Sequence, residues 1–287
     1  MSPLWMLLLL LGASPAGAPP PPGGQPPPGG QPQPPKKIEI SAHRLQVLGD
    51  EKKSIYRENA HVRSEDMELR CDELVVFYTH QRTVLRIEAH GRVEAHNQQN
   101  QAKGEKAFFY NETGLLEVTG NPEAQFIGGL VRGSKVLLDT RTQEALVENP
   151  QTLLHNGQEG AKETDVHIAA EQLKLERDKK TATWERHVQL RRGSLLMRSP
   201  SLRAFYDEKG QLQKAIATGG VEVQDEFRWA KSQTAHLDNR RGLIVLMGNP
   251  EIKEGNNHLR GSRISFVIGK HTLTVENAKT VFEVNNP

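Results

Sequence analysis

The sequence lacks several features that define common classes of protein. It has one cysteine, so it cannot form an internal disulfide or a cysteine-based zinc site. Its net charge is only +2, from 37 Lys and Arg against 35 Asp and Glu, which excludes the concentrated basic excess of a nucleic-acid-binding protein. Of the 17 prolines, 12 lie in the first 35 residues, so the rest of the chain contains few residues that interrupt regular structure.

The motifs of common catalytic and metal sites are also missing. The chain contains no G-x-S-x-G, no H-E-x-x-H, no phosphate-binding glycine loop and no EF-hand loop. The histidines are scattered, and the closest pair at strand spacing, His90 with His96, lacks further metal ligands. We therefore expect no enzyme, no metal and no cofactor. Cys71, in a strand pattern, is expected to be a small inward or rim residue, because a redox role needs a lowered thiol pKa.

The first 35 residues differ in composition from the rest. Leu4 to Ala13 form an apolar run of about ten residues, half of what a bilayer-spanning helix needs. Ala16-Gly17-Ala18 follows at the spacing of a signal-peptidase site, although no Lys or Arg precedes the run. This predicts export with a signal peptide over residues 1–18, cleaved after Ala18; a permanent membrane anchor is the weaker alternative. Residues 19–35 consist only of Pro, Gly and Gln, which predicts a disordered, extended linker with polyproline II character.

The remaining chain is a tandem duplication. Over residues 38–149 and 166–277, 30 of 112 positions are identical without a gap. Three short motifs recur in the same order at an offset of 128: G-N-P-E at 120–123 and 248–251, R-G-S at 132–134 and 260–262, and V-E-N at 147–149 and 275–277. This predicts two β-repeats, over residues 36–157 and 158–287.

Each copy has the pattern of short antiparallel strands. Apolar and polar residues alternate, as in Leu45-Gln46-Val47 and Val221-Glu222-Val223, and turn motifs recur every 10 to 15 residues. A weaker sub-period of about 30 residues corresponds to a hairpin module. The predicted fold is all-β: an antiparallel, open β-jellyroll built from hairpin repeats and duplicated in tandem. Terminal repeats would leave unpaired strand edges, which invite strand addition.

Seven pairs of apolar positions persist across the duplication and alternate along the predicted strands, so they are expected to share the inward face. This face is either a packed core or the lining of a groove for an apolar ligand, and periodicity alone does not separate the two. The pairs are Leu69 with Met197, Val76 with Ala204, Val93 with Val221, Phe109 with Leu237, Val118 with Leu246, Val136 with Ile264 and Leu138 with Phe266.

The G-N-P-E turn, the R-G-S-[KR]-[VI] strand start and the V-E-N close resemble the repeat of the OstA-like family, across essentially all of residues 38–287. That family includes the periplasmic lipopolysaccharide transport protein LptA and the periplasmic domains of its membrane-bound partners. The resemblance implies a V-shaped jellyroll in the periplasm whose apolar interior carries lipid A acyl chains. The partners it implies are lipopolysaccharide and, through strand-edge docking, the inner-membrane export complex, the outer-membrane translocon and a second copy of the chain, head to tail.

Four basic residues flank the two R-G-S turns. They are expected either to meet lipid phosphates or carboxylates at the groove mouth or to be solvated charges on an exposed turn. These residues are Arg132, Lys135, Arg260 and Arg263.

Three functions therefore remain to be compared. The first is a non-enzymatic lipopolysaccharide carrier and bridge. The second is a structural β-repeat module of the cell envelope with a packed core and no lipid ligand. The third, an envelope hydrolase, would need a cluster of catalytic groups that the sequence does not reveal.

Overall fold

The computed structural model describes residues 38–63, 68–96, 101–126, 129–155, 165–208, 210–267 and 273–281. Within these residues all regular secondary structure is β, and every strand pairing is antiparallel. The predicted all-β, antiparallel fold class is confirmed. The predicted signal peptide and linker lie outside the described residues, and none of the described residues forms a helix capable of crossing a membrane.

The two copies contain the same strands in the same order. The first copy forms β1 (Glu39–Ser41), β2 (Arg44–Leu48), β3 (Lys53–Arg63), β4 (Glu68–Tyr78), β5 (Val84–His96), β6 (Gln101–Tyr110), β7 (Leu115–Thr119), β8 (Glu123–Phe126), β9 (Gly129–Arg132), β10 (Lys135–Asp139), β11 (Glu144–Glu148) and β12 (Gln151–Leu154). The second copy forms β13 (Val166–Ala169), β14 (Gln172–Glu176), β15 (Thr181–Arg192), β16 (Leu195–Tyr206), β17 (Leu212–Gln224), β18 (Arg228–Asp238), β19 (Leu243–Met247), β20 (Glu251–Glu254), β21 (Asn257–Arg260), β22 (Arg263–Val267), β23 (Leu273–Glu276) and β24 (Lys279–Val281).

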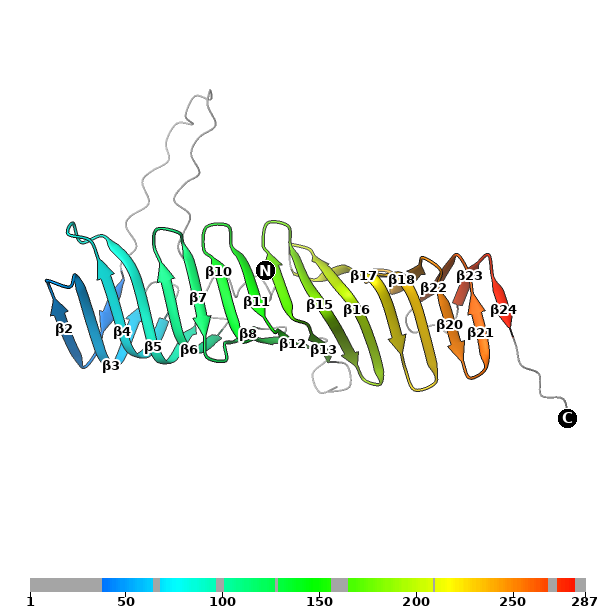
Figure 1. Cartoon of the computed structure of the whole chain (residues 1–287), viewed down its shortest axis with the longest axis horizontal. Coiled ribbons are helices and arrows are strands. Elements are labelled where there is room, and N and C mark those ends of the chain that lie inside the picture. The colour runs from blue at the N-terminus through cyan, green and yellow to red at the C-terminus, as the bar shows by residue number, and fades with distance from the viewer. Residues whose placement is uncertain are drawn as a thin grey trace, which may run out of the picture.

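These strands build two layers that meet along one side, which we call the corner. The long strands β3 to β6 and β15 to β18 run through both layers. Between them, the first layer continues through β7, β10, β11 and β14, and the second through β8, β9, β12 and β13 (Figure 1). On the opposite side, where the turns of the β2–β3, β4–β5 and β6–β7 hairpins lie, no strand pairing among the described residues joins the two layers.

The long strands bend at β-bulges in the corner. Their pairing registers shift between Arg57 and Ala60 and between His90 and Val93, and the residues at the bends have left-handed backbone conformations. The short strands cross the corner through the G-N-P-E turn, where Gly120 has φ 79° and Asn121 has φ 53°. A Cβ at position 120 would lie 2.3 Å from the Cβ of Glu105, so the turn requires glycine for both space and conformation.

The R-G-S and V-E-N motifs recur together because they contact each other. A Cβ on Gly133 would lie 2.5 Å from Val147 Cγ1 and 2.8 Å from the Glu148 carbonyl oxygen. The Ser134 amide donates to that same carbonyl at 2.9 Å, and Asn149 Nδ2 donates to Ser134 Oγ at 3.0 Å. The second copy repeats this arrangement around Gly261.

The two copies join as one continuous sandwich. Strand β11 pairs with β14 in the first layer, and β12 pairs with β13 in the second. Trp184 of the second copy is fully buried in the shared core, and its Nε1 donates to Thr152 Oγ1 of the first copy at 3.1 Å. The predicted boundary between residues 157 and 158 falls outside the described residues and stays a prediction.

Candidate functional site

The candidate site is the surface enclosed between the two layers. Neighbouring strands place their inward side chains in three rows that cross every strand pairing from one end of the sandwich to the other. Inner row 1, in the first layer, consists of Leu45, Tyr56, Leu74, Ala89, Ala107, Val118, Val136, Val147, Leu173, Trp184, Leu202, Ala217, Ala235, Leu246, Ile264 and Val275.

Two further rows complete this surface. Inner row 2, also in the first layer, consists of Val47, Ser54, Val76, Ile87, Phe109, Leu116, Leu138, Ala145, Leu175, Ala182, Ala204, Ala215, Leu237, Ile244, Phe266 and Leu273. Inner row 3, in the second layer, consists of Ile40, Val62, Leu69, Ala95, Ala102, Ala124, Val131, Thr152, Ile168, Leu190, Met197, Val223, Ala230, Ile252, Leu259 and Thr280. No residue of the three rows carries a charge.

The fourteen apolar positions selected from the sequence all lie on this inward surface. Twelve belong to the inner rows, and Val93 and Val221 face inward at the corner, where both are buried. The candidate positions selected from the sequence did not include Leu173, Leu175 and Trp184, which are among the largest fully buried side chains of the molecule. They also did not include Leu74, although this residue is identical to its counterpart Leu202.

The interior is closed in the middle and open at both ends. Around Trp184 the inner side chains are fully buried, whereas Leu45 and Val47 at the N-terminal end are 54% and 61% exposed. At the C-terminal end, Leu273 is 43% exposed. These residues are exposed because β2 and β23 pair on one side only, so that no strand covers the last apolar side chains of the inner rows.

The four basic residues beside the R-G-S turns lie on the outer face at the corner, on the side of the sandwich opposite the hairpin turns. Each is paired with a carboxylate of a neighbouring strand, and the distances are 2.6 Å for Arg132 with Glu123, 3.0 Å for Lys135 with Glu117, 2.9 Å for Arg260 with Glu251 and 3.9 Å for Arg263 with Glu276. The structure therefore gives each of them a protein partner, and binding of lipid phosphates stays a prediction.

Glu251 is the centre of the densest of these charge clusters. It is nearly buried, and it accepts from His258 Nδ1 at 3.0 Å, from an Arg260 guanidinium nitrogen at 2.9 Å and from Lys231 Nζ at 3.1 Å. The hydrogen bond from His258, together with those from Arg260 and Lys231, lowers the pKa of Glu251 to about 2, although burial acts in the opposite direction. The cluster joins β18, β20 and β21 through charge-assisted hydrogen bonds.

Cys71 is buried at the corner, and its thiol donates to the Glu73 carbonyl oxygen at 3.3 Å. Burial raises the pKa of this thiol to about 11, so it is protonated at neutral pH and has no thiolate character. Among the described residues, no three His, Cys, Asp or Glu side chains are grouped so that they could hold a metal ion.

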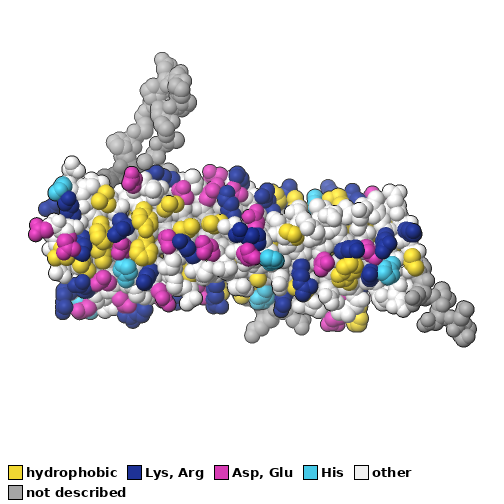
Figure 2. Space-filling model, in the orientation of Figure 1, with side chains coloured by type: hydrophobic (Ala, Val, Ile, Leu, Met, Phe, Trp, Pro, Cys, Tyr) yellow, Lys and Arg dark blue, Asp and Glu magenta, His cyan; other side chains and the backbone are white. Residues whose placement is uncertain are grey.

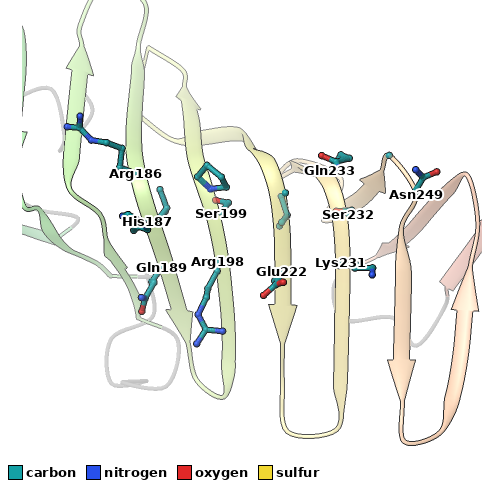
Figure 3. A pocket seen from close by; sticks show the side chains of 15 residues that line it. Arg186, His187, Gln189, Arg198, Ser199, Glu222, Lys231, Ser232, Gln233 and Asn249 are labelled. Atoms are coloured by element: carbon teal, nitrogen blue, oxygen red, sulfur yellow. The ribbon is translucent and has the colours of Figure 1, made fainter.

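An open groove of about 660 Å³ lies at the corner of the second copy (Figure 3). Its lining includes Arg198, Pro200 and Gly220, and no atom lies within 4 Å of the position that a Cβ on Gly220 would occupy. The counterparts in the first copy are Asp72 for Pro200 and Arg92 for Gly220, and these two side chains form an ion pair. The groove lies where the second copy lacks that pair.

The sequence comparison identifies the family. The model described as "LptA/(LptD N-terminal domain) LPS transport protein" matches residues 39–144 and 167–271, one segment in each copy and together well over half of the chain. The chain belongs to this family of lipopolysaccharide transport proteins. Membership confirms the tandem duplication, and it confirms that the chain is a transport protein and not an enzyme.

One solved structure gives a more distant comparison. The chain is similar to LptH from Pseudomonas aeruginosa, described as the LptA-homologous periplasmic component of the conserved lipopolysaccharide transport device. The identity is 12%, the TM-score is 0.39, and the match covers 43% of this chain and 98% of LptH. No curated protein sequence matches the chain.

Proposed function

We propose that the chain is a periplasmic, LptA-like carrier that shields lipid A acyl chains between its two layers and bridges the inner and outer membranes. The observation that carries this proposal is the absence of charge from all three inner rows over both copies. Moving one acyl chain of about 14 carbons from water into such a surface is worth on the order of 10 kcal/mol, at about 0.8 kcal/mol per CH₂ group.

A surface without charge along its whole length also allows the lipid to move along the protein. Acyl chains that slide from one copy to the next would meet no charged side chain, so they would stay shielded throughout. This movement needs no covalent chemistry by the protein, and the work of extracting the lipid from the membrane must come from a partner.

A photo-crosslinking experiment tests the proposal. A benzophenone amino acid at Phe109 or Leu237 lies in inner row 2, whereas at Tyr110 or Asp238 the same group lies on the outer face of the same strands. Lipopolysaccharide should be captured at the two inner positions and not at the two outer ones. Equal capture on both faces, or none at the inner positions, contradicts the proposal.

The second candidate is a structural module with a packed core, and one observation favours it. The interior around Trp184, Leu173 and Val147 is fully buried, so a lipid could pass this point only if the layers moved apart. Native mass spectrometry of the exported protein separates the two candidates, because the carrier should retain lipopolysaccharide and the structural module should not.

We propose further that the two open ends dock to neighbouring molecules. The strand pairing at the junction between the two copies serves as the template for this docking. Strands β11 and β14 at this junction correspond to β23 and β2 at the two ends of the chain, and β12 and β13 correspond to β24 and β1. By the register of the internal junction, Val275 of one chain would lie opposite Leu45 of the next. Glu276 would lie opposite Arg44, with opposite charges.

Engineered cysteines test this head-to-tail register. The variant Leu45→Cys/Val275→Cys, in a chain whose Cys71 is replaced by the Ser of its counterpart Ser199, should form a ladder of disulfide-linked chains on oxidation. The control pair Leu45→Cys/Thr274→Cys is shifted by one residue, which turns one thiol to the opposite face. Equal ladders from both pairs, or none from the first, would contradict docking in this register. Docking to the inner-membrane export complex and to the outer-membrane translocon would use the same two ends.

Location in the periplasm completes this proposal. It depends on export by the N-terminal segment, which lies outside the described residues. The mass of the protein isolated from the periplasm should correspond to a chain that begins at Pro19. A mature protein that keeps residues 1–18 would instead support a membrane anchor.

A further inference from the structure

The outer face of the first layer differs between the two copies. In the first copy, outward side chains of β3, β4, β6, β10 and β11 form an apolar band across the strands, which we call the outer stripe (Figure 2). Ile55 and Val75, on adjacent strands, are buried within it, while Tyr110 is 38% exposed. The outer stripe consists of Ile55, Val75, Phe108, Tyr110, Leu137 and Leu146.

The second copy shows that the fold does not require this band. It has the same strands in the same pairings, yet each of the six counterparts is polar or charged. These counterparts are Thr183, Arg203, His236, Asp238, Ser265 and Thr274. The same row of the second copy keeps two apolar residues, Ile216 and Val245, at the positions of Glu88 and Glu117. The six positions that are apolar only in the first copy indicate a contact of that copy with another segment.

The shape and chemistry of the outer stripe fit a single extended chain. It is one side chain wide except at Tyr110, which lies in the neighbouring row. It crosses seven strands, which at ~4.8 Å per strand spacing makes it roughly 29 Å long. Two glutamates interrupt it, and both are paired: Glu88 with Arg86 at 2.8 Å and with His90 at 3.2 Å, and Glu117 with Lys135 at 3.0 Å. These carboxylates leave acceptor positions for the side-chain amides of an occupant.

We propose that the outer stripe is the docking site of residues 19–35 of the same chain. This segment contains only Pro, Gly and Gln, and polyproline-type chains, which lack internal hydrogen bonds, dock on surfaces lined by aromatic side chains such as Phe108 and Tyr110. At ~3.1 Å per residue its 17 residues reach about 53 Å, so roughly ten of them span the stripe and the others connect to Ile38. Attachment to the first copy gives the segment a high effective concentration there, and its Gln side chains meet Glu88 and Glu117.

Photo-crosslinking of the exported chain tests this docking. A benzophenone amino acid at Tyr110 should form intramolecular crosslinks to residues 19–35, which peptide mass spectrometry identifies. The matched control is the same group at Asp238, the counterpart in the second copy, where at least tenfold less crosslinked peptide is expected. Equal yields at the two positions overturn the proposal, as do crosslinks from position 110 that join two chains or reach other segments only.

Two further variants test whether the crosslink depends on the apolar side chains of the outer stripe. Val75→Arg and, separately, Leu137→Ser introduce the side chains of the second copy, which the same fold accepts at the equivalent positions. Each should lower the crosslink yield from position 110 at least fivefold while the far-UV circular dichroism stays unchanged, and an unchanged yield in both overturns the proposal. This inference does not depend on lipid transport, since lipopolysaccharide capture at Phe109 should be the same with and without residues 19–35.

Discussion

The junction between the two copies depends on Trp184, and its replacement should cost more than any other single change in the core. Trp184→Ala removes a fully buried indole, which costs about 3–5 kcal/mol. It also leaves the buried Thr152 hydroxyl without its 3.1 Å donor, which adds about 1 kcal/mol. A total of roughly 4–6 kcal/mol is a large share of the 5–15 kcal/mol that typically stabilises a domain.

Urea unfolding followed by far-UV circular dichroism measures this effect without relying on tryptophan fluorescence. The native chain should unfold in one transition because the sheets are continuous, and Trp184→Ala should lower the midpoint and separate the transitions of the two copies. Tyr56→Ala is the matched control, since Tyr56 occupies the same position in the first copy but lies beside the open end and is partly exposed. The reasoning is refuted if Trp184→Ala costs less than about 1 kcal/mol, or no more than Tyr56→Ala.

Three further predictions concern a turn, a charge cluster and a thiol. Gly133→Ala should destabilise the chain by about 1–3 kcal/mol in thermal unfolding, because its Cβ would meet Val147 at 2.5 Å, while Gly49→Ala, which meets nothing within 4 Å, should have little effect. The pKa of Glu251 is depressed to about 2 on folding, so its contribution to stability is fully present above its ordinary value of 4.5 and is lost as pH falls toward 2. The free energy of unfolding of Glu251→Gln should therefore fall less than that of the native chain as the pH is lowered through this range. An equal fall in both proteins would contradict this prediction. Cys71, whose pKa is raised to about 11, should react with iodoacetamide at pH 8 at least 100-fold more slowly in the folded chain than in urea; similar rates would mean that the thiol is accessible.

The sequence by itself determined the repeated elements of this protein. Alternation with a period of two identifies strands because it reflects the geometry of a single chain, and the duplication is visible as identity at one offset. The G-N-P-E, R-G-S and V-E-N motifs are equally local, since each maintains a turn or a contact that both copies need. For these reasons the fold class, the duplication and the inward positions such as Val76 and Phe109 were accessible without coordinates.

Only the tertiary structure decided what surrounds these elements. The ion partners of Arg132 and Arg260 are glutamates on neighbouring strands, and the burial of Trp184 depends on strands from both copies. No local pattern contains this information, because it arises from pairings between distant segments.

The same limit explains why the outer stripe could not be read from the sequence. Leu74, Val75 and Val76 are consecutive apolar residues, so the run carries no alternation from which a face could be assigned. The register of β4 turns Leu74 and Val76 into the core and Val75 outward beside Ile55. Apolar residues of β4 therefore lie on both faces of the sheet, and only the pairing of the strands shows which of them face the core.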